Sequence, residues 1–427
     1  MSSKKVFKNM LVVMTGSIAA KFIGLLSIPI ITRLYSPIEM GKLSIFIAVI
    51  SLMLPFSTFK YSISIPSIQS RRQALNMCAL CGCILMLSLL FCVLLLALGY
   101  YFFNGSTLIY FEVIYEYVLL VPICLIGFGL YEIYESWAVR DEKFKVISFA
   151  RFSQSLVGNL TKVFTGFITK SYLGLFLGHS LTLFAGVFVI LFVFPTKEFY
   201  KTIDRQVIKF LLIKFSTYPK FRLPSQFLLI FSVQLPLLYF GLVFDTYYVG
   251  QLGLALTCIA LPIALVGQSA GQAYYSEVAK IGVGGIFEIK KLTIEISKRL
   301  LLLSIIPALI LFYFGEQVFI FSFGDDWRLA GNYVELLSLF LIPQFLSTPI
   351  VNVLNVLNKQ KVFLFINLQR VILILFVLLI STFLGLDEKN CVLFYSITMF
   401  AHYFFTYAYI VKIIDIYSKR KMKDGSI

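Results

Sequence analysis

The sequence has little charge and few of the polar stretches that a soluble protein needs for its surface. Only 14% of its 427 residues are charged, whereas 59% are apolar. Soluble domains carry about a quarter charged residues, so this composition excludes an ordinary soluble fold. Apolar runs recur to the end of the chain, and at about 18 to 25 residues each is long enough to cross a hydrocarbon core of ~30 Å.

Twelve such runs predict an all-α, polytopic membrane protein with twelve transmembrane helices. A membrane barrel would instead show short strands in which apolar and polar residues alternate. The predicted spans are residues 10–33, 42–62, 76–102, 115–138, 147–169, 172–195, 223–245, 247–270, 300–321, 333–357, 361–385 and 391–414.

The chain also lacks the parts that a membrane enzyme would need. A polysaccharide polymerase or ligase would place acidic and histidine residues in a sizeable external loop, but the predicted outer connections are short. The two histidines, His179 and His402, both lie inside apolar spans. The sequence therefore predicts a protein that is not an enzyme and uses no cofactor, with a polymerase or ligase as the less favoured alternative.

Cysteine is present without a disulfide framework. Six of the seven cysteines lie within predicted spans, and Cys391 lies at the edge of one. Cys78, Cys81 and Cys83 in the stretch CALCGC have a spacing that suits a metal. Buried thiols acting as small apolar residues explain them better, so no metal site is predicted.

The net charge of +16 is distributed unevenly along the chain. If the N-terminus is cytoplasmic, most Lys and Arg residues fall in the inner segments. The predicted outer segments hold only Arg33, Lys42, Lys170, Arg328 and Lys389. This asymmetry follows the positive-inside rule, which predicts that both termini are cytoplasmic and argues against nucleic acid as a partner.

The pattern divides the chain into two lobes of six spans. Residues 1–195 form the first lobe, and residues 223–427 form the second lobe with a basic cytoplasmic tail. Between them, residues 196–222 form a cytoplasmic linker with an amphipathic helix, FYKTIDRQVIKFLLIKF, suited to the surface of an anionic leaflet. KVISFARFSQ and KVFLFINLQR occupy equivalent places in the two lobes, which favours parallel repeats of the kind found in transporters.

Cations inside the spans point to the function, because a charged side chain in the bilayer normally faces a partner or a watery cavity. Lys21 shares a helical stripe with Ser17, Ala20, Gly24 and Ser27. The fifth span repeats the pattern on one face, with Arg151, Ser155, Gly158, Lys162 and Thr165.

These cations have two interpretations. Arg151 either pairs with Glu132 or Glu135 of the fourth span or faces water. We favour a hydrated central cavity for Lys21 and Lys162, with Arg370 facing it from the second lobe. Such a lining predicts anionic cargo.

Polar residues other than the cations give weaker signals. Glu132 and Glu135 are candidates for ion coupling or for ion pairs. Asn352 and Asn355 in the tenth span either bind sugar hydroxyls or bond to neighbouring helices.

The stretch TGSIAAKFIGLLSIPIITRLYSPIEMGKLSIF, residues 15–46, resembles the start of Wzx-type O-unit flippases. These belong to the multidrug/oligosaccharidyl-lipid/polysaccharide transporter superfamily. The resemblance rests on the turn formed by Arg33, Leu34, Tyr35, Ser36, Pro37 and Gly41. Ser36 and Pro37 suit the start of the second helix. FGDDWRLAGNY at residues 323–333 also resembles a stretch of this family.

The resemblance implies a MATE-like pair of six-helix lobes around a central cavity in the bacterial cytoplasmic (inner) membrane. It further implies undecaprenyl-pyrophosphate-linked sugar repeat units, for O-antigen or capsule, as cargo that moves from the inner to the outer leaflet by alternating access. Membrane lipids and other polysaccharide assembly proteins would be its partners. A multidrug or ion antiporter of the same fold is the main alternative, and the absence of a central carboxylate argues against it.

Overall fold

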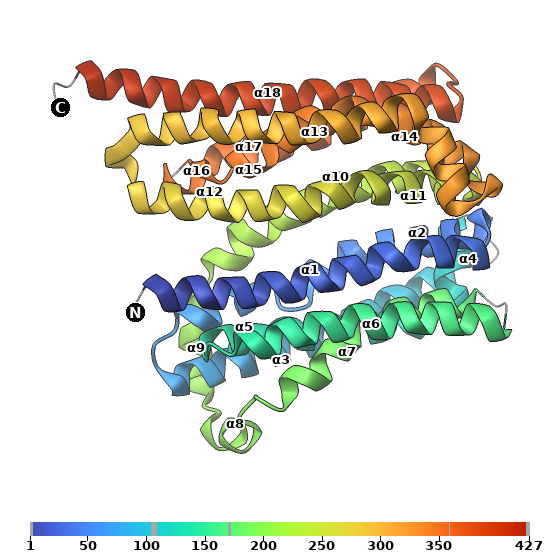
Figure 1. Cartoon of the computed structure of the whole chain (residues 1–427). Coiled ribbons are helices and arrows are strands. Elements are labelled where there is room, and N and C mark those ends of the chain that lie inside the picture. The colour runs from blue at the N-terminus through green and yellow to red at the C-terminus, as the bar shows by residue number, and fades with distance from the viewer. Residues whose placement is uncertain (1–2, 104–108, 170–171, 358, 424–427) are drawn as a thin grey trace. The chain divides into compact units, whose positions relative to one another are not determined.

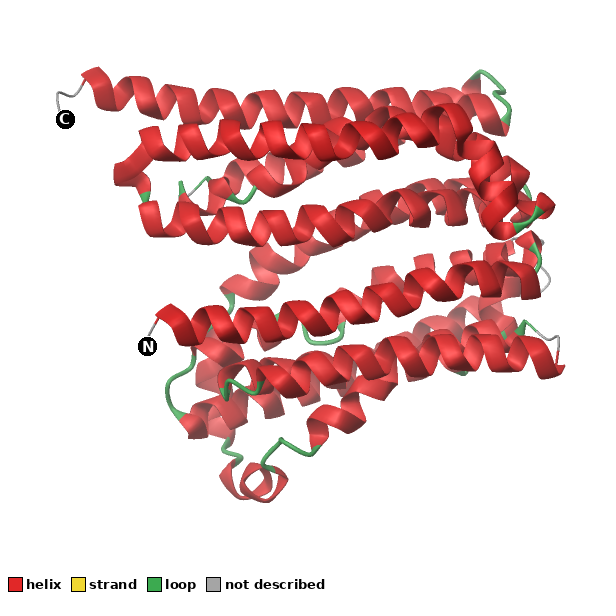
Figure 2. Ribbon diagram, viewed as in Figure 1, coloured by secondary structure: helices red, strands yellow, loops and turns green. Residues whose placement is uncertain are grey.

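The structure is a computed structural model that describes residues 3–103, 109–169, 172–357 and 359–423. All regular structure within these ranges is helical, as Figure 2 shows. The predicted fold class, an all-α polytopic protein, is confirmed.

The chain divides into two compact units, Met1–Gln234 and Leu235–Ile427 (Figure 1). The helices of the first unit are α1 (Ser3–Leu34), α2 (Pro37–Met53), α3 (Arg71–Phe103), α4 (Ile109–Glu116), α5 (Leu120–Arg140), α6 (Phe144–Thr169), α7 (Leu173–Leu191), α8 (Thr196–Thr202) and α9 (Arg205–Lys214). Shorter turns of helix follow α2 at Leu54–Phe56 and Tyr61–Ser67 and precede α10 at Tyr218–Arg222. Helix α10 (Leu223–Val243) contains the division between the units.

The second unit continues with α11 (Thr246–Pro262), α12 (Gln268–Ile281), α13 (Ile286–Phe323), α14 (Arg328–Leu337), α15 (Leu341–Ile350), α16 (Val353–Val356), α17 (Gln360–Phe383) and α18 (Glu388–Lys423). Short helical turns at Ile263–Gly267, Val283–Gly285, Asp325–Trp327 and Ser338–Phe340 join some of them. Within this unit α13 packs against α14, α15 and α18, and α17 packs against α18.

Ten helical segments of the described chain are long and apolar enough to cross a membrane. The chain is therefore a multi-pass membrane protein. Helices α5 and α6 coincide with the other two predicted spans, but their hydropathy is lowered by Glu132, Glu135, Arg151 and Lys162. Charged side chains thus concentrate on two neighbouring helices of the first unit.

The turn between α1 and α2 is built as the sequence predicts, although α2 begins five residues earlier than the predicted span. Ser36 caps α2: its hydroxyl accepts from the backbone amide of Glu39, whose carboxylate accepts from the Ser36 amide at 2.7 Å. Pro37 occupies the first turn of the helix, where it removes no intrahelical hydrogen bond. Tyr35 is buried, and its hydroxyl donates to the carbonyl of Lys162 at 2.8 Å, so this turn also fixes the end of α6.

Helix α6 packs between α1 and α7, and small residues make both contacts close. On the α1 side, the Ser155 hydroxyl donates to the Ala20 carbonyl at 2.6 Å. On the α7 side, a Cβ built on Gly158 would lie 1.7 Å from Thr182 Oγ1 and 2.9 Å from the Gly178 carbonyl oxygen. This packing of small residues is typical of helices inside membranes.

Gly158→Ala should therefore lower the free energy of unfolding by about 1 to 3 kcal/mol, the usual cost of overpacking. The backbone carbonyl of Gly178 cannot move away without shifting α7. Gly24→Ala is a matched control, since a Cβ at Gly24 meets no described heavy atom within 4 Å. Denaturant unfolding of both variants in one detergent tests this, and equal stabilities would contradict it.

The linker, residues 196–222, differs from the prediction of one amphipathic helix. It contains two short α-helices, α8 and α9, and the helical turn at Tyr218–Arg222. Asp204 lies between α8 and α9 and caps α9 by accepting from the Gln206 amide at 2.8 Å. The segment is tied to α3 by ion pairs from Arg71 to Glu198 at 2.7 Å and from Arg72 to Asp204 at 2.9 Å. The helix predicted over FYKTIDRQVIKFLLIKF is therefore broken before Asp204, and α9 forms its second part.

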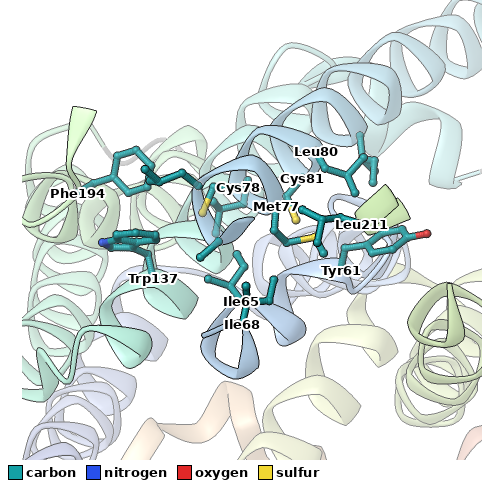
Figure 3. Packing of buried hydrophobic residues seen from close by; sticks show 14 residues of the cluster. Tyr61, Ile65, Ile68, Met77, Cys78, Leu80, Cys81, Trp137, Phe194 and Leu211 are labelled. Atoms are coloured by element: carbon teal, nitrogen blue, oxygen red, sulfur yellow. The ribbon is translucent and has the colours of Figure 1, made fainter. Parts of the chain in front are cut away.

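Helix α9 also contributes to a buried apolar cluster of the first unit, drawn in Figure 3. Leu211 is fully buried there with Cys78 and Cys81 of α3, whereas the neighbouring Cys83 is exposed. Two of the three cysteines of CALCGC thus serve as core residues.

The proposed lobe boundaries at 195 and 223 stay a prediction.

Candidate functional site: the cationic helices of the first unit

Arg151 lies at the contact between α1 and α6. Its guanidinium donates to the Ser17 hydroxyl at 2.7 Å and forms an ion pair with Glu135 of α5 at 2.9 Å. The Glu135 carboxylate also accepts from the Tyr131 hydroxyl at 3.2 Å. Of the two carboxylates predicted as possible partners, Glu135 is therefore the one that pairs with Arg151, and the charge of Arg151 is balanced within the unit.

Glu132 lies one turn away on α5 and has a different partner. Its carboxylate forms an ion pair with Lys60 at 2.8 Å and accepts from the Thr58 hydroxyl at 2.8 Å. The Lys60 and Glu132 side chains are only 10% and 16% exposed, so the pair is largely withdrawn from solvent. A pairing of Glu132 with Arg151 was the wrong alternative.

The backbone around Lys60 is strained. Phe59 and Lys60 both have positive φ, 47° and 62°, where non-glycine residues are uncommon. Each left-handed residue costs roughly 1 to 2 kcal/mol, so the surroundings must hold this turn in place. The ion pair to Glu132 does so, and the Lys60 ammonium also lies 5.6 Å from the centre of the Phe128 ring.

Lys21 is half-buried on α1, one turn beyond Ser17. It lies close enough to Arg151 for their like charges to interact, and Arg151 donates to Ser17, one turn before Lys21 on α1. One turn beyond Lys21, a Cβ built on Gly24 would meet no described heavy atom of the first unit within 4 Å. Lys21 and Arg151, both predicted as substrate-binding residues, are thus brought together.

Lys162 lies three turns farther along α6 and faces α7. Its side chain packs against Gly178, where an added Cβ would lie 2.4 Å from Lys162 Cγ. The imidazole of His179 on α7 lies within electrostatic reach of the Lys162 ammonium. Within the described residues no carboxylate lies within 4.0 Å of the Lys162 ammonium, so this cation has no acidic partner there.

The polar face predicted for α6 is therefore shared by two neighbours. Arg151 and Ser155 contact α1, whereas Gly158, Lys162 and Thr165 contact α7. Residues at spacings of three and four lie on one side of a helix, but that side is wide enough to meet two partners.

The other predicted site residues belong to the second unit. Arg370 lies on α17, with its guanidinium 5.6 Å from the centre of the Tyr403 ring. Asn352 donates to the Pro349 carbonyl at 3.3 Å in the same turn of chain, and Asn355 is exposed. The structure does not bring these three together with one another as a single cluster.

Sequence reasoning missed three participants. Lys60 lies near the end of the predicted span 42–62, but its link to Glu132 depends on the turn after α2. His179 was placed only as an apolar-span residue, although Lys162 lies near it. Tyr35 is part of the turn on which the family resemblance rests, but its hydrogen bond to the α6 backbone is visible only in the folded structure.

Basic side chains outnumber acidic ones on the described parts of α1, α5 and α6. Two ion pairs, Lys60 with Glu132 and Arg151 with Glu135, balance two of the cations. Lys21 lies beside Arg151, and Lys162 has no carboxylate within 4.0 Å among the described residues. A surplus of basic side chains on neighbouring helices attracts anions and disfavours cations.

No family model matches the chain, and no curated protein matches it. Solved structures do match over nearly its whole length. A multidrug resistance MATE family transporter of the MOP superfamily, in an inward-facing conformation, aligns with a TM-score of 0.70 at 12% identity, covering 95% of this chain and 96% of that one. The lipid II flippase MurJ, in an inward closed conformation, aligns with a TM-score of 0.67 at 13% identity, covering 96% of this chain and 91% of that one.

A third match is a MOP superfamily transporter from Pyrococcus furiosus, described as having a binding pocket of reverse polarity that suggests a different function. It aligns with a TM-score of 0.59 at 13% identity over 96% of each chain. At these identities the likeness shows the fold alone. The chain has the fold of MOP superfamily transporters, a class that includes both drug transporters and a lipid-linked flippase.

Proposed function

We propose that this chain is a flippase of the bacterial cytoplasmic membrane that moves undecaprenyl-pyrophosphate-linked oligosaccharide units from the inner to the outer leaflet. The units would serve O-antigen or capsule assembly, and both termini would be cytoplasmic. The observation that carries the proposal is the set of basic side chains on α1 and α6, where Lys21 lies beside Arg151 and Lys162 has no carboxylate within 4.0 Å among the described residues.

The chemistry of the cargo explains why cations are needed. Its pyrophosphate is an anion, and moving it through the bilayer interior is costly unless fixed positive charges offset the lost hydration. Lys21 has a neighbouring guanidinium, so it is suited to meet such a group. Alternating access of the two units would then expose the site to one leaflet at a time.

Two observations disfavour the multidrug exporter as an alternative. A transporter of cationic drugs uses an unpaired carboxylate, but Glu132 and Glu135 are both engaged by basic side chains. The fold itself also occurs in a lipid II flippase, so a lipid-linked cargo is compatible with it. A sugar polymerase or ligase has no support from the fold.

The test is deletion of the gene in its native host, followed by complementation at a matched level in the membrane. We expect deletion to abolish surface polysaccharide while lipid-linked repeat units accumulate on the cytoplasmic side. The wild-type gene should reverse both effects. A deletion strain that exports normal polysaccharide but becomes sensitive to cationic drugs would favour the multidrug exporter instead.

A further inference from the structure

Several buried polar atoms of the second unit have no hydrogen-bond partner. Two of them, Ser297 Oγ and Tyr333 Oη, lie on α13 and α14, and the others belong to side chains on three helices, α15, α17 and α18. These others are Gln344 Oε1, Asn367 Nδ2, Gln369 Oε1, Arg370 Nε, His402 Nδ1 and Thr406 Oγ1. The Asn367, His402 and Thr406 side chains are 6%, 2% and 4% exposed. Buried polar atoms are almost always satisfied in native proteins, so such a group indicates a water or an ion among them.

Tyr403 shows that these side chains lie at one level of the unit. The Arg370 guanidinium lies 5.6 Å from its ring centre, and Gln344 Nε2 donates to its hydroxyl at 2.9 Å. His402 precedes it in α18 and lies within electrostatic reach of Arg370. Three helices thus meet around one aromatic ring.

The register of α17 and α18 adds the remaining two residues. The helices are consecutive, pack against each other and are joined by a short turn, so they run antiparallel. Since Arg370 contacts the Tyr403 ring, Asn367, one turn before Arg370, and Thr406, one turn after Tyr403, lie on neighbouring turns of the two helices. The unpartnered Asn367 amide and Thr406 hydroxyl therefore belong to the same stretch of the α17–α18 contact as the unpartnered guanidinium nitrogen.

The charge of this cluster decides what it can hold. Arg370 keeps its charge in proteins, and no carboxylate of the described residues forms an ion pair with it. The Arg370 and Asn367 atoms are hydrogen-bond donors, and the Thr406 hydroxyl donates as well. A cation would meet a fixed positive charge there, whereas a small anion would be neutralised by it.

We infer that the Arg370, Asn367 and Thr406 side chains form a binding site for a small monovalent anion, of which chloride is the type. The bound anion would balance Arg370 and link α17 to α18. In this inference Arg370 binds a small anion inside the second unit and does not bind the lipid-linked cargo. The inference does not depend on the proposed function, because it uses only residues of this unit.

Thermal unfolding of the purified full-length protein in detergent tests the site. The probe is sodium chloride against sodium gluconate at equal concentration and ionic strength, since gluconate is too large for the cluster. We expect chloride to raise the Tm by about 2 °C or more, because a ligand that binds only the folded state stabilises it. Lys361→Gln, an exposed cation of the same helix, should keep the full chloride response.

Arg370→Gln should lose this response, and Asn367→Leu and Thr406→Val should weaken it, which keeps the test decisive if Arg370→Gln does not fold. Equal Tm values of the wild type in the two salts would mean that water alone fills the cluster and would overturn the inference. A chloride response that persists in all three variants would overturn it as well, since the anion would then bind elsewhere.

Discussion

Replacing Lys21 with glutamine or alanine should reduce polysaccharide export by about ten-fold or more, while Lys21→Arg retains most of it. A hydrogen bond to a charged group contributes about 1.5 to 3 kcal/mol, and 1.4 kcal/mol corresponds to a factor of ten. Arginine keeps the charge beside Arg151, whereas glutamine keeps only the approximate shape. The measurement is surface polysaccharide in the deletion strain at matched protein levels.

Lys145→Gln provides the control, because Lys145 is an exposed cation at the start of α6. It removes the same charge without touching the α1–α6 contact and should leave export unchanged. Lipid-linked repeat units should accumulate inside cells carrying Lys21→Gln and Lys21→Ala. Full export by all Lys21 variants would show that its charge is dispensable, and the account of an anion-attracting interior around it would be wrong.

Breaking the Lys60–Glu132 pair from one side should be among the most destabilising single changes in the first unit. We expect Lys60→Met to lower the free energy of unfolding by about 3 to 5 kcal/mol, since it leaves a largely buried carboxylate without its cation. Methionine keeps the unbranched shape at the same left-handed backbone, so the strain at this position is unchanged. Unfolding in one detergent provides the measurement.

The double variant Lys60→Met with Glu132→Gln should recover much of this loss, because the neutral amide still accepts from Thr58. Lys280→Gln with Glu277→Gln is the matched control, an exposed pair for which each single change should cost less than about 1 kcal/mol. If the loss of unfolding free energy in the double variant equalled the sum of the losses in the two single variants, the Lys60 and Glu132 side chains would not be energetically coupled.

The sequence predicts the helical class well because hydropathy and span length are local properties. The same holds for the start of α2, where Ser36, Pro37 and Glu39 form the cap from residues close in sequence. The ends of helices inside the predicted spans are harder to predict from the sequence. The left-handed turn at Phe59 and Lys60 interrupts an apolar stretch that carries no glycine, and only tertiary contacts explain it.

The candidate site was predictable in part. The stripes on the first and fifth spans placed Lys21 and Arg151 on faces that do meet, because small residues at regular spacing are typical of helix contacts. The choice between Glu132 and Glu135 could not be made from one helix, since it depends on Lys60, which is 72 residues away. The periodicity of the linker predicts one continuous helix, because an aspartate on the polar face fits a helix interior as well as a helix cap. The structure shows that Asp204 is a cap.

The central claim is that the chain carries an anionic lipid-linked oligosaccharide across the bilayer. Its most direct test uses proteoliposomes that contain the purified protein and a fluorescent undecaprenyl-pyrophosphate oligosaccharide, with imposed proton and sodium gradients. A reagent that cannot cross the membrane reports the labelled headgroups on the outer leaflet. The account predicts that wild-type protein moves the label across the bilayer and that Lys21→Gln does so at about a tenth of the rate or less. Transfer no faster than in protein-free vesicles under every gradient would contradict it.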